Sequence, residues 1–246
     1  MTSHLPDTFD GWPPEGVLFP VQSVSLRVLD GEHPFHSAQK AAAMENWRHE
    51  VARQPAVFDG RMVFQHRVSL VDGAIASEAY VVPYSTFLWW RRQPVRAGGV
   101  HLFAFPVLVS GDGALIAIRM SKTTVNAGQV YFAAGSLDPS DIVDGYCDIE
   151  ANMRREVREE TGLDLDDGTV VADPQLYGAH ANRSVTLYRL FRFAMTADEL
   201  IAAINRHEDQ EGEVEEAVAI RSADPALHRY NPAMLPLLDW FFSEKR

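Results

Sequence analysis

The sequence predicts an α+β protein, in which an α/β/α sandwich with a mixed sheet follows a small β-rich N-terminal lobe. Stretches of alternating apolar and polar residues indicate strands, and stretches with an apolar residue every three to four positions indicate helices. In the C-terminal part these follow the order strand, strand, helix, strands, helix, strand, helix, which favours a sheet between helices. The chain has 246 residues, 46% of them hydrophobic, so it can bury the core that such a fold needs.

The first 97 residues are expected to form an accessory lobe, 1–97. Its predicted elements are a strand at 21–29, a helix at 37–52, strands at 61–71 and 74–82, and a helix at 84–92. Ser37 is the predicted N-cap of the first helix, because a serine side chain accepts hydrogen bonds from free helix amides. Asp72-Gly73 is typical of a tight hairpin turn between two strands.

Gly98-Gly99 begins a second block, and residues 98–246 are expected to form the sandwich domain. Its predicted strands are 101–109, 114–120, 129–133, 175–177, 185–195 and 213–220, and its predicted helices are 149–161, 197–205 and 232–242. Asp148 is the predicted N-cap of the first helix, and Gly162 suits the left-handed residue at its end. Residues 135–146 are expected to form a loop.

Composition excludes several classes of function. A formal net charge of −12 disfavours nucleic acid as a partner. No run of eighteen apolar residues is present, so no membrane span is predicted. The single cysteine, Cys147, excludes an intrachain disulfide framework and a multi-cysteine zinc site. No signal peptide is recognised, so a cytoplasmic location is expected. A homodimer stays open as an alternative to a monomer.

Three glutamates crowd one face of the helix predicted at 149–161. Glu156, Glu159 and Glu160 are three and four positions apart, so they occupy adjacent rows of the helix surface. Arg155 can pair with Glu159, but Glu156 and Glu160 remain a like-charge pair. Clustered carboxylates are hard oxygen ligands, which suit Mg²⁺ or Mn²⁺. We expect Glu160 to lie at the surface, where it can reach such an ion.

A charged helix is more often a solvated face than a metal site, so composition alone does not decide the question. The order of the residues is more specific. Arg155, Glu156, Glu159, Glu160 and Gly162 are five fixed positions, and at roughly one in fifteen per residue a chance match in this chain is rare.

These positions resemble the second half of the Nudix box, Arg-Glu-aliphatic-any-Glu-Glu-any-Gly-aliphatic. The first half of that box, a glycine, five residues, a glutamate and seven residues, matches in part. Gly135 resembles the box glycine but precedes Arg155 by 20 residues rather than 14, so the loop between them carries six extra residues. Cys147 stands where the family has its first glutamate, and Asp148 is expected to replace it.

The resemblance implies a mechanism as well as a fold. Glu156, Glu159 and Glu160 would hold Mg²⁺ or Mn²⁺, together with the Gly135 carbonyl, and the metal would bridge diphosphate oxygens. Arg155 would orient a glutamate. A general base would come from a later loop, where Glu211, Glu213, Glu215 and Glu216 gather; Glu213 and Glu215 are the candidates that we retain.

Other residues are weaker candidates. Arg119 ends a predicted strand and is a candidate phosphate contact, whereas His180 and Arg183 precede another strand near the expected substrate entrance. For both loop residues an ordinary surface role is the simpler interpretation, and we retain Arg183 with Arg119 as candidate substrate contacts.

The expected reaction is metal-dependent hydrolysis of a phosphoanhydride bond in a nucleoside diphosphate linked to another moiety. The segment around Trp47 and Pro55-Ala56-Val57-Phe58-Asp59-Gly60 resembles the start of UDP-sugar hydrolysing Nudix proteins, which favours a nucleotide sugar slightly. The alternative is a Nudix domain with a decayed box that binds or senses a nucleotide without turnover. Magnesium-dependent turnover distinguishes the two.

Overall fold

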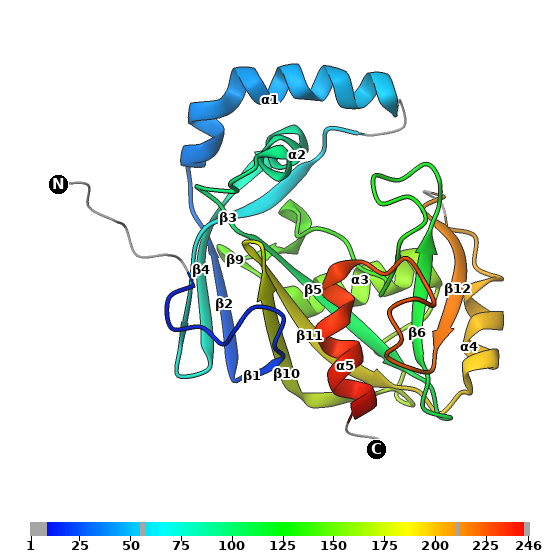
Figure 1. The fold of residues 1–246 in the computed structure, drawn as a ribbon. Coiled ribbons are helices and arrows are strands. Elements are labelled where there is room, and N and C mark those ends of the chain that lie inside the picture. The colour runs from blue at the N-terminus through cyan, green and yellow to red at the C-terminus, as the bar shows by residue number, and fades with distance from the viewer. Residues whose placement is uncertain (1–8, 55–57, 210–211, 244–246) are drawn as a thin grey trace.

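The computed structural model describes residues 9–54, 58–209 and 212–243, which form two sheets and their covering helices (Figure 1). The large sheet contains β1 (Phe19–Val21), β5 (His101–Val109), β6 (Leu115–Met120), β7 (Val130–Tyr131), β10 (Val171–Ala181), β11 (Ser184–Arg192) and β12 (Val214–Ile220). The small sheet contains β2 (Ser23–Val28), β3 (Arg61–Val71), β4 (Ala74–Pro83), β8 (Ile142–Val143) and β9 (Tyr146–Cys147). The helices are α1 (Pro34–Arg53), α2 (Tyr84–Arg92), α3 (Ile149–Thr161), α4 (Ala197–Ile204) and α5 (Leu235–Ser243), with 3-10 turns η1 (Pro139–Asp141) and η2 (Pro232–Met234).

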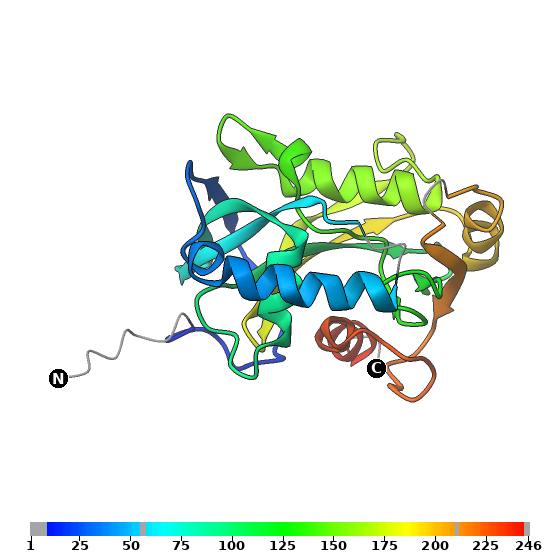
Figure 2. The same cartoon turned by 90° about the horizontal axis from the view of Figure 1, so that it is seen from above.

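The large sheet is mixed, as predicted. Its strands follow the order β1-β10-β11-β5-β6-β12, with β7 beside β6; β5 and β11 run parallel, whereas β10–β11, β5–β6 and β6–β12 run antiparallel. Helix α3 covers one face, and α5 lies on the other, on the same side as α1 and α2 (Figure 2). The prediction of an α+β protein with a mixed sheet between helices is confirmed.

Strands β5 and β6 diverge from each other along the sheet. Their pairing covers only Leu108 with Ile116 and Val109 with Leu115, next to the turn that joins them. On its other side, β5 pairs with β11 along its whole length, whereas β6 pairs with β12.

The small sheet and two helices form the part of the fold before residue 98. The β3–β4 hairpin is confirmed, and its turn residues Asp72 and Gly73 have positive φ angles of 48° and 78°, as a tight hairpin requires. Beneath α1, helix α2 buries Phe87 and Trp90 in a separate aromatic cluster with Phe64. The Phe87 ring also contacts the ring of His101 in β5 of the large sheet, with 4.5 Å between the centroids.

Strands are shared across the boundary that the sequence suggests at residues 97 and 98. Strand β1 pairs with β10 in the large sheet, whereas β9 pairs with β2 in the small sheet. One hydrophobic core also joins both parts of the chain, from Phe19 and Leu26 to Phe241. The division into 1–97 and 98–246 stays a prediction.

Two sequence predictions in the N-terminal part are wrong. Helix α1 begins at Pro34 and not after Ser37, because the His33 Nδ1 atom accepts a hydrogen bond from the Phe35 amide at 3.1 Å and proline suits the first helical turn. The Ser37 hydroxyl instead donates to Glu32. The strand expected at 21–29 is split between β1 and β2, which belong to different sheets.

The loop expected at 135–146 contains regular structure. The 3-10 turn η1 is followed by the β8–β9 hairpin, whose two strands join the edge of the small sheet. No helix in the described part of the chain is long and apolar enough to cross a membrane.

Candidate active site

Helix α3 is held at both ends and along one side. The Asp148 carboxylate caps its start, accepting hydrogen bonds from the amides of Glu150 and Ala151 at 3.0 and 2.9 Å. Gly162 ends it with a left-handed φ of 70°. Ile149, Met153 and Val157 are buried against the core, as their spacing predicts. These contacts fix the direction in which the glutamates project.

Two of the three glutamates are buried, so the expectation that Glu160 lies at the surface is wrong. Glu156 is 8% exposed and Glu160 is 6% exposed, whereas Glu159 remains exposed. Both buried side chains lie one helical turn apart. Because a carboxylate rarely enters the interior without a compensating group, their burial requires an explanation.

The buried glutamates lack sufficient positive charge around them. Burial, followed by the charges of Glu159 and Asp141 against the opposing effect of Arg155, raises the pKa of Glu156 to about 8. Burial and the neighbouring charges of Glu156 and Glu213 raise the pKa of Glu160 well above its ordinary value. The Glu160 Oε2 atom is buried without a hydrogen-bond partner among the described residues. A bound cation would supply the missing charge and the missing partner.

Gly135 lies directly against the Glu156 carboxylate. A Cβ atom at Gly135 would lie 2.4 Å from Glu156 Oε1 and 2.5 Å from Oε2, closer than real Cβ atoms approach other atoms. The glycine thus lets the backbone meet the carboxylate at close range. The structure therefore brings together Gly135 and Glu156, which are far apart in sequence, as the box pattern predicts.

Gly135→Ala is expected to lower turnover about a hundredfold, because the new methyl group must displace the Glu156 carboxylate, and small misplacements in an active site have effects of that order. The matched control is Gly168→Ala, since Gly168 has no positive φ angle and a Cβ atom there would meet no other atom within 4 Å. Steady-state kinetics of both variants test this. Equal turnover in Gly135→Ala and the wild type would show that the contact is unimportant.

Arg155 is surrounded by carboxylates. Its guanidinium lies 2.8 Å from Glu156 Oε1, 3.1 Å from Glu159 Oε2 and 3.2 Å from Asp141 Oδ2, and Asp138 lies at 3.4 Å. The predicted pairing of Arg155 with Glu159 is confirmed. Arg155 therefore links the box helix to the loop that follows Gly135.

Asp141 was not identified from the sequence, yet it is the most buried carboxylate of this network. It is 3% exposed, and its Oδ2 atom accepts hydrogen bonds from Asn152 Nδ2 and the Asp138 amide, both at 2.9 Å. Five residues separate it from Gly135, the spacing of the first acidic residue in the box. Asp148, expected in that role, is the cap of α3 instead.

The six extra residues of the box form the β8–β9 hairpin. Residues 142–147 follow Asp141 directly, and the remaining seven residues before Arg155 match the family spacing. Counting from Gly135 would have found Asp141, whereas counting back from Arg155 reaches Cys147. The Cys147 side chain is buried in the hairpin, and burial raises its thiol pKa to about 12.

The site contains side chains that suit a divalent cation, but they do not already form a complete set of converging ligands. Among the described residues, no three histidine, cysteine, aspartate or glutamate side chains converge on one point that could hold a metal. Arg155 engages Glu156 and Glu159, which accounts for part of this. Buried Glu160, with its unpartnered oxygen, and Glu156 beside Gly135 still fit a hard cation in donor type and charge.

A large cavity of about 970 Å³ opens beside these residues. Gly135, Asp138 and Glu160 are among the residues that line it. Glu213 also lines the cavity, and its charge acts on both Glu156 and Glu160. Glu160 therefore connects the glutamates of α3 to the cavity, whereas Glu156 and Glu159 are not part of its lining.

Among the weaker candidates in the described residues, His180 lines the cavity and is buried rather than on the surface, with its Nε2 atom 2.6 Å from the Pro13 carbonyl oxygen; the others do not line it. Glu215 is exposed and does not line the cavity, and Glu211 lies outside the described residues. Glu216 accepts a hydrogen bond from Arg119 Nε at 2.8 Å, so Arg119 faces this partner and does not line the cavity. Arg183 donates to the Gly99 carbonyl at 3.1 Å and is likewise absent from the lining. Their roles stay predictions.

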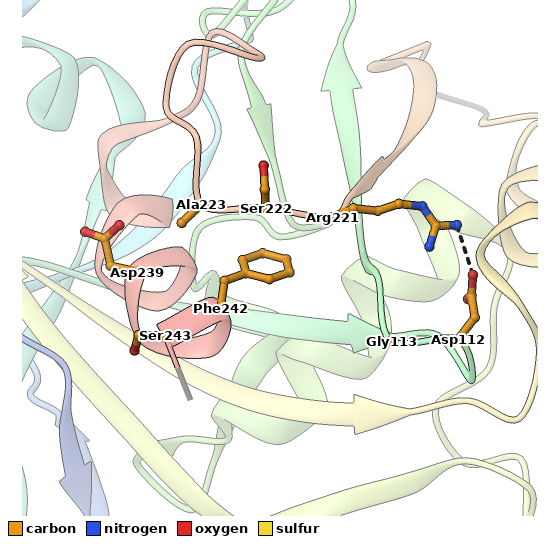
Figure 3. Close-up of a pocket in the computed structure, with 8 residues that line it drawn as sticks. All are labelled: Asp112, Gly113, Arg221, Ser222, Ala223, Asp239, Phe242 and Ser243. Atoms are coloured by element: carbon orange, nitrogen blue, oxygen red, sulfur yellow. Dashed lines mark hydrogen bonds and ion pairs between the residues drawn. The ribbon is translucent and has the colours of Figure 1, made fainter. Parts of the chain in front are cut away.

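A second pocket, of about 530 Å³, lies away from the glutamates (Figure 3). It contains no residue that the sequence selected, and its Arg221 is paired with Asp112 at 2.9 Å. It is lined by Asp112, Gly113, Arg221, Ser222, Ala223, Asp239, Phe242 and Ser243. The chemistry is therefore sought in the larger cavity.

Comparison with solved structures finds similar chains of low sequence identity. A MutT protein from Methanosarcina mazei Go1 is 14% identical, with a TM-score of 0.39, over 60% of this chain and 96% of that chain. The E. coli ORF135 protein is 14% identical, with a TM-score of 0.35, over 59% and 92%. DR0079 from Deinococcus radiodurans is 12% identical, with a TM-score of 0.45, over 74% and 99%. Curated proteins provide no significant match by sequence.

The sequence itself matches the NUDIX domain over residues 101–241. The match covers more than half of the chain and includes Gly135, Asp141 and the whole of α3. The chain therefore belongs to the Nudix family, as a pyrophosphohydrolase of the kind that acts on nucleoside diphosphate derivatives.

Proposed function

We propose that the protein hydrolyses a phosphoanhydride bond in a nucleoside diphosphate linked to another moiety, with Mg²⁺ or Mn²⁺ bound at the glutamates of α3. The observation that carries the proposal is the burial of Glu160, with an unpartnered oxygen, in the lining of the large cavity. Nudix hydrolases generally use divalent metals such as Mg²⁺. A buried carboxylate with an unpartnered oxygen is suited to bind a cation.

Each residue has a distinct role in the proposal. Glu160 and Glu156 would hold the metal, together with the exposed Glu159, and Gly135 lies beside Glu156. When bound, the metal neutralises the charge that builds on the diphosphate oxygens. Arg155 is a positioning residue, since its contacts fix Glu156 and Glu159 relative to the loop after Gly135.

Glu213 is the candidate general base. Of the glutamates retained from its segment, it alone lines the cavity within the described part of the chain. Its amide and that of Val214 both donate to Asp209 Oδ2, at 2.5 and 2.9 Å, which holds the strand end next to the site. A base must lie within reach of the attacking water, and this position satisfies that condition better than the exposed Glu215.

A nucleotide sugar is the first substrate to examine. The support is the similarity of the N-terminal segment to UDP-sugar hydrolysing Nudix proteins, of which residues 55–57 lie outside the described residues. Other residues of the same segment, Phe58 and Gly60, line the large cavity. The accessory part of the chain thus contributes to the wall that a substrate would contact.

The test is turnover of a nucleotide panel with Mg²⁺, Mn²⁺ or EDTA. A coupled phosphatase releases phosphate from the products, and this phosphate is measured. The panel comprises UDP-glucose, ADP-ribose, NADH, coenzyme A and diadenosine polyphosphates. We expect cleavage of at least one compound, abolished by EDTA. Tight binding of one compound without cleavage of any would favour the decayed binding module instead.

A further inference from the structure

One wall of the large cavity is a face of the large sheet with a regular pattern of side chains. Side chains two positions apart on a strand share a face, and His101 and Phe103 of β5 both line the cavity. Their partners in register on β11 are Ser184 and Thr186, which line it too. A molecule on this face meets aromatic rings on one strand and hydroxyl groups on the next.

The aromatic rings continue in contact along the cavity. The ring of Phe87 lies 4.5 Å from that of His101, which stacks on Phe103 at 4.6 Å, and Phe103 meets Phe105 at 5.2 Å. Phe105 in turn stacks on Tyr131 at 6.1 Å. This row joins Phe87 of helix α2 to Tyr131, on whose hydroxyl group the charge of Glu160 acts. Such a row accommodates a ring-shaped or planar group between its ends.

Three arginines, Arg61, Arg91 and Arg96, also line the cavity. Arg61 and Arg96 donate to the carbonyls of Val81 and Asn182, and within the described residues none of the three arginines forms an ion pair with a carboxylate. The Arg91 guanidinium lies over the Phe87 ring at 5.7 Å, at the start of the aromatic row. Arginines in a cavity without acidic partners are suited to bind an anion.

The lining of one cavity therefore includes both carboxylates and arginines. A diphosphate bound through a cation belongs beside Glu160, and it leaves the arginines without an anionic partner among the described residues. We propose that the arginines bind a second anionic group of the substrate, separated from the diphosphate by a ring-bearing moiety on the aromatic row. The inference rests on the proposed hydrolase function and narrows its substrate class to diphosphates that carry such a group.

Two sources of the second anion share this chemistry. It can be a carboxylate on the moiety beyond the diphosphate, as in a nucleoside diphosphate hexuronate, or a phosphate on a ribose. Both give an oxyanion that a guanidinium can bind through two hydrogen bonds. Substrate pairs that differ only in this group distinguish them: UDP-glucose with UDP-glucuronate, and ADP-ribose with its 2′-phosphate.

The experiment measures binding of all four compounds by calorimetry in EDTA, so that it does not depend on turnover. The diphosphate contributes to both members of a pair, and the ratio of their dissociation constants isolates the extra anion. In the wild type we expect the anionic member of one pair to bind at least tenfold more tightly. Arg91→Gln and, as a second variant, Arg61→Gln should each lower that ratio about tenfold.

Arg92→Gln is the matched control on the same helix. Arg92 donates to Glu50 at 2.9 and 2.5 Å and does not line the cavity, so its loss should leave the ratio unchanged. Ratios near one in both pairs, a ratio unaffected by both Arg91→Gln and Arg61→Gln, or no binding of any compound would overturn the inference. Preferential binding without metal-dependent cleavage would refute the hydrolase proposal alone.

Discussion

Glu160→Gln is expected to lower turnover about a thousandfold and, in the absence of metal, to stabilise the fold. The loss corresponds to about 4 kcal/mol of transition-state stabilisation, as expected when a metal ligand is neutralised. The gain in folding stability arises because Glu160 is buried beside Glu156 with an unpartnered oxygen, so the charge of Glu160 opposes folding. Glutamine keeps the shape and removes the charge.

Thermal unfolding with EDTA or Mg²⁺ tests both halves of this prediction. In EDTA the variant should unfold at a higher temperature than the wild type, whereas Mg²⁺ should stabilise the wild type much more than the variant. Glu150→Gln is the control, because Glu150 lies on the same helix and pairs with Arg154 and Arg189 outside the glutamate cluster. Near-normal turnover in Glu160→Gln would contradict the metal assignment.

Asp141→Ala is expected to lower the free energy of unfolding by about 3–5 kcal/mol, the usual result of removing one partner from a buried ion pair. Asp141 is 3% exposed and binds Arg155, Asn152 and the Asp138 amide. For a chain of this length the melting temperature should fall by about 10 °C. Turnover should also fall, because Arg155 would no longer hold Glu156 and Glu159 in place.

A double-mutant cycle with Arg155→Met separates the ion pair from other effects of the aspartate. If the two residues act together, the double variant should be at least about 2 kcal/mol more stable than the sum of the single effects implies. Chemical denaturation of the four proteins provides the four free energies. Additive losses would mean that Asp141 stabilises the loop without acting through Arg155.

Local patterns in the sequence predicted most of the elements. The β3–β4 hairpin, α2 and α3 occur where alternation, turn residues and caps indicate them, because each of these signals acts over a few residues. The exceptions depend on distant partners. Strand β1 pairs with β10 and not with the neighbouring β2, and β9 of the β8–β9 hairpin pairs with β2. No local pattern contains that information.

The candidate site shows the same limit. Spacing on one helix identified Glu156, Glu159 and Glu160, and it predicted the Arg155 pairing. Burial of Glu160 was missed, since whether a helical face meets water depends on the loops that fold over it. The presence of Arg61, Arg91 and Arg96 in one cavity lining could not be predicted either, because their segments meet only in the folded chain.

The position of strand β1 early in the chain determines when it can pair during synthesis of the protein. Gln175 Nε2 donates to the Val21 carbonyl across 154 positions of sequence, and Phe19 pairs with Gly178. A nascent chain must therefore expose its first strand until β10 has left the ribosome, and such distant pairings slow folding. We expect ribosome-bound chains that end before residue 170 to be more sensitive to protease than longer ones.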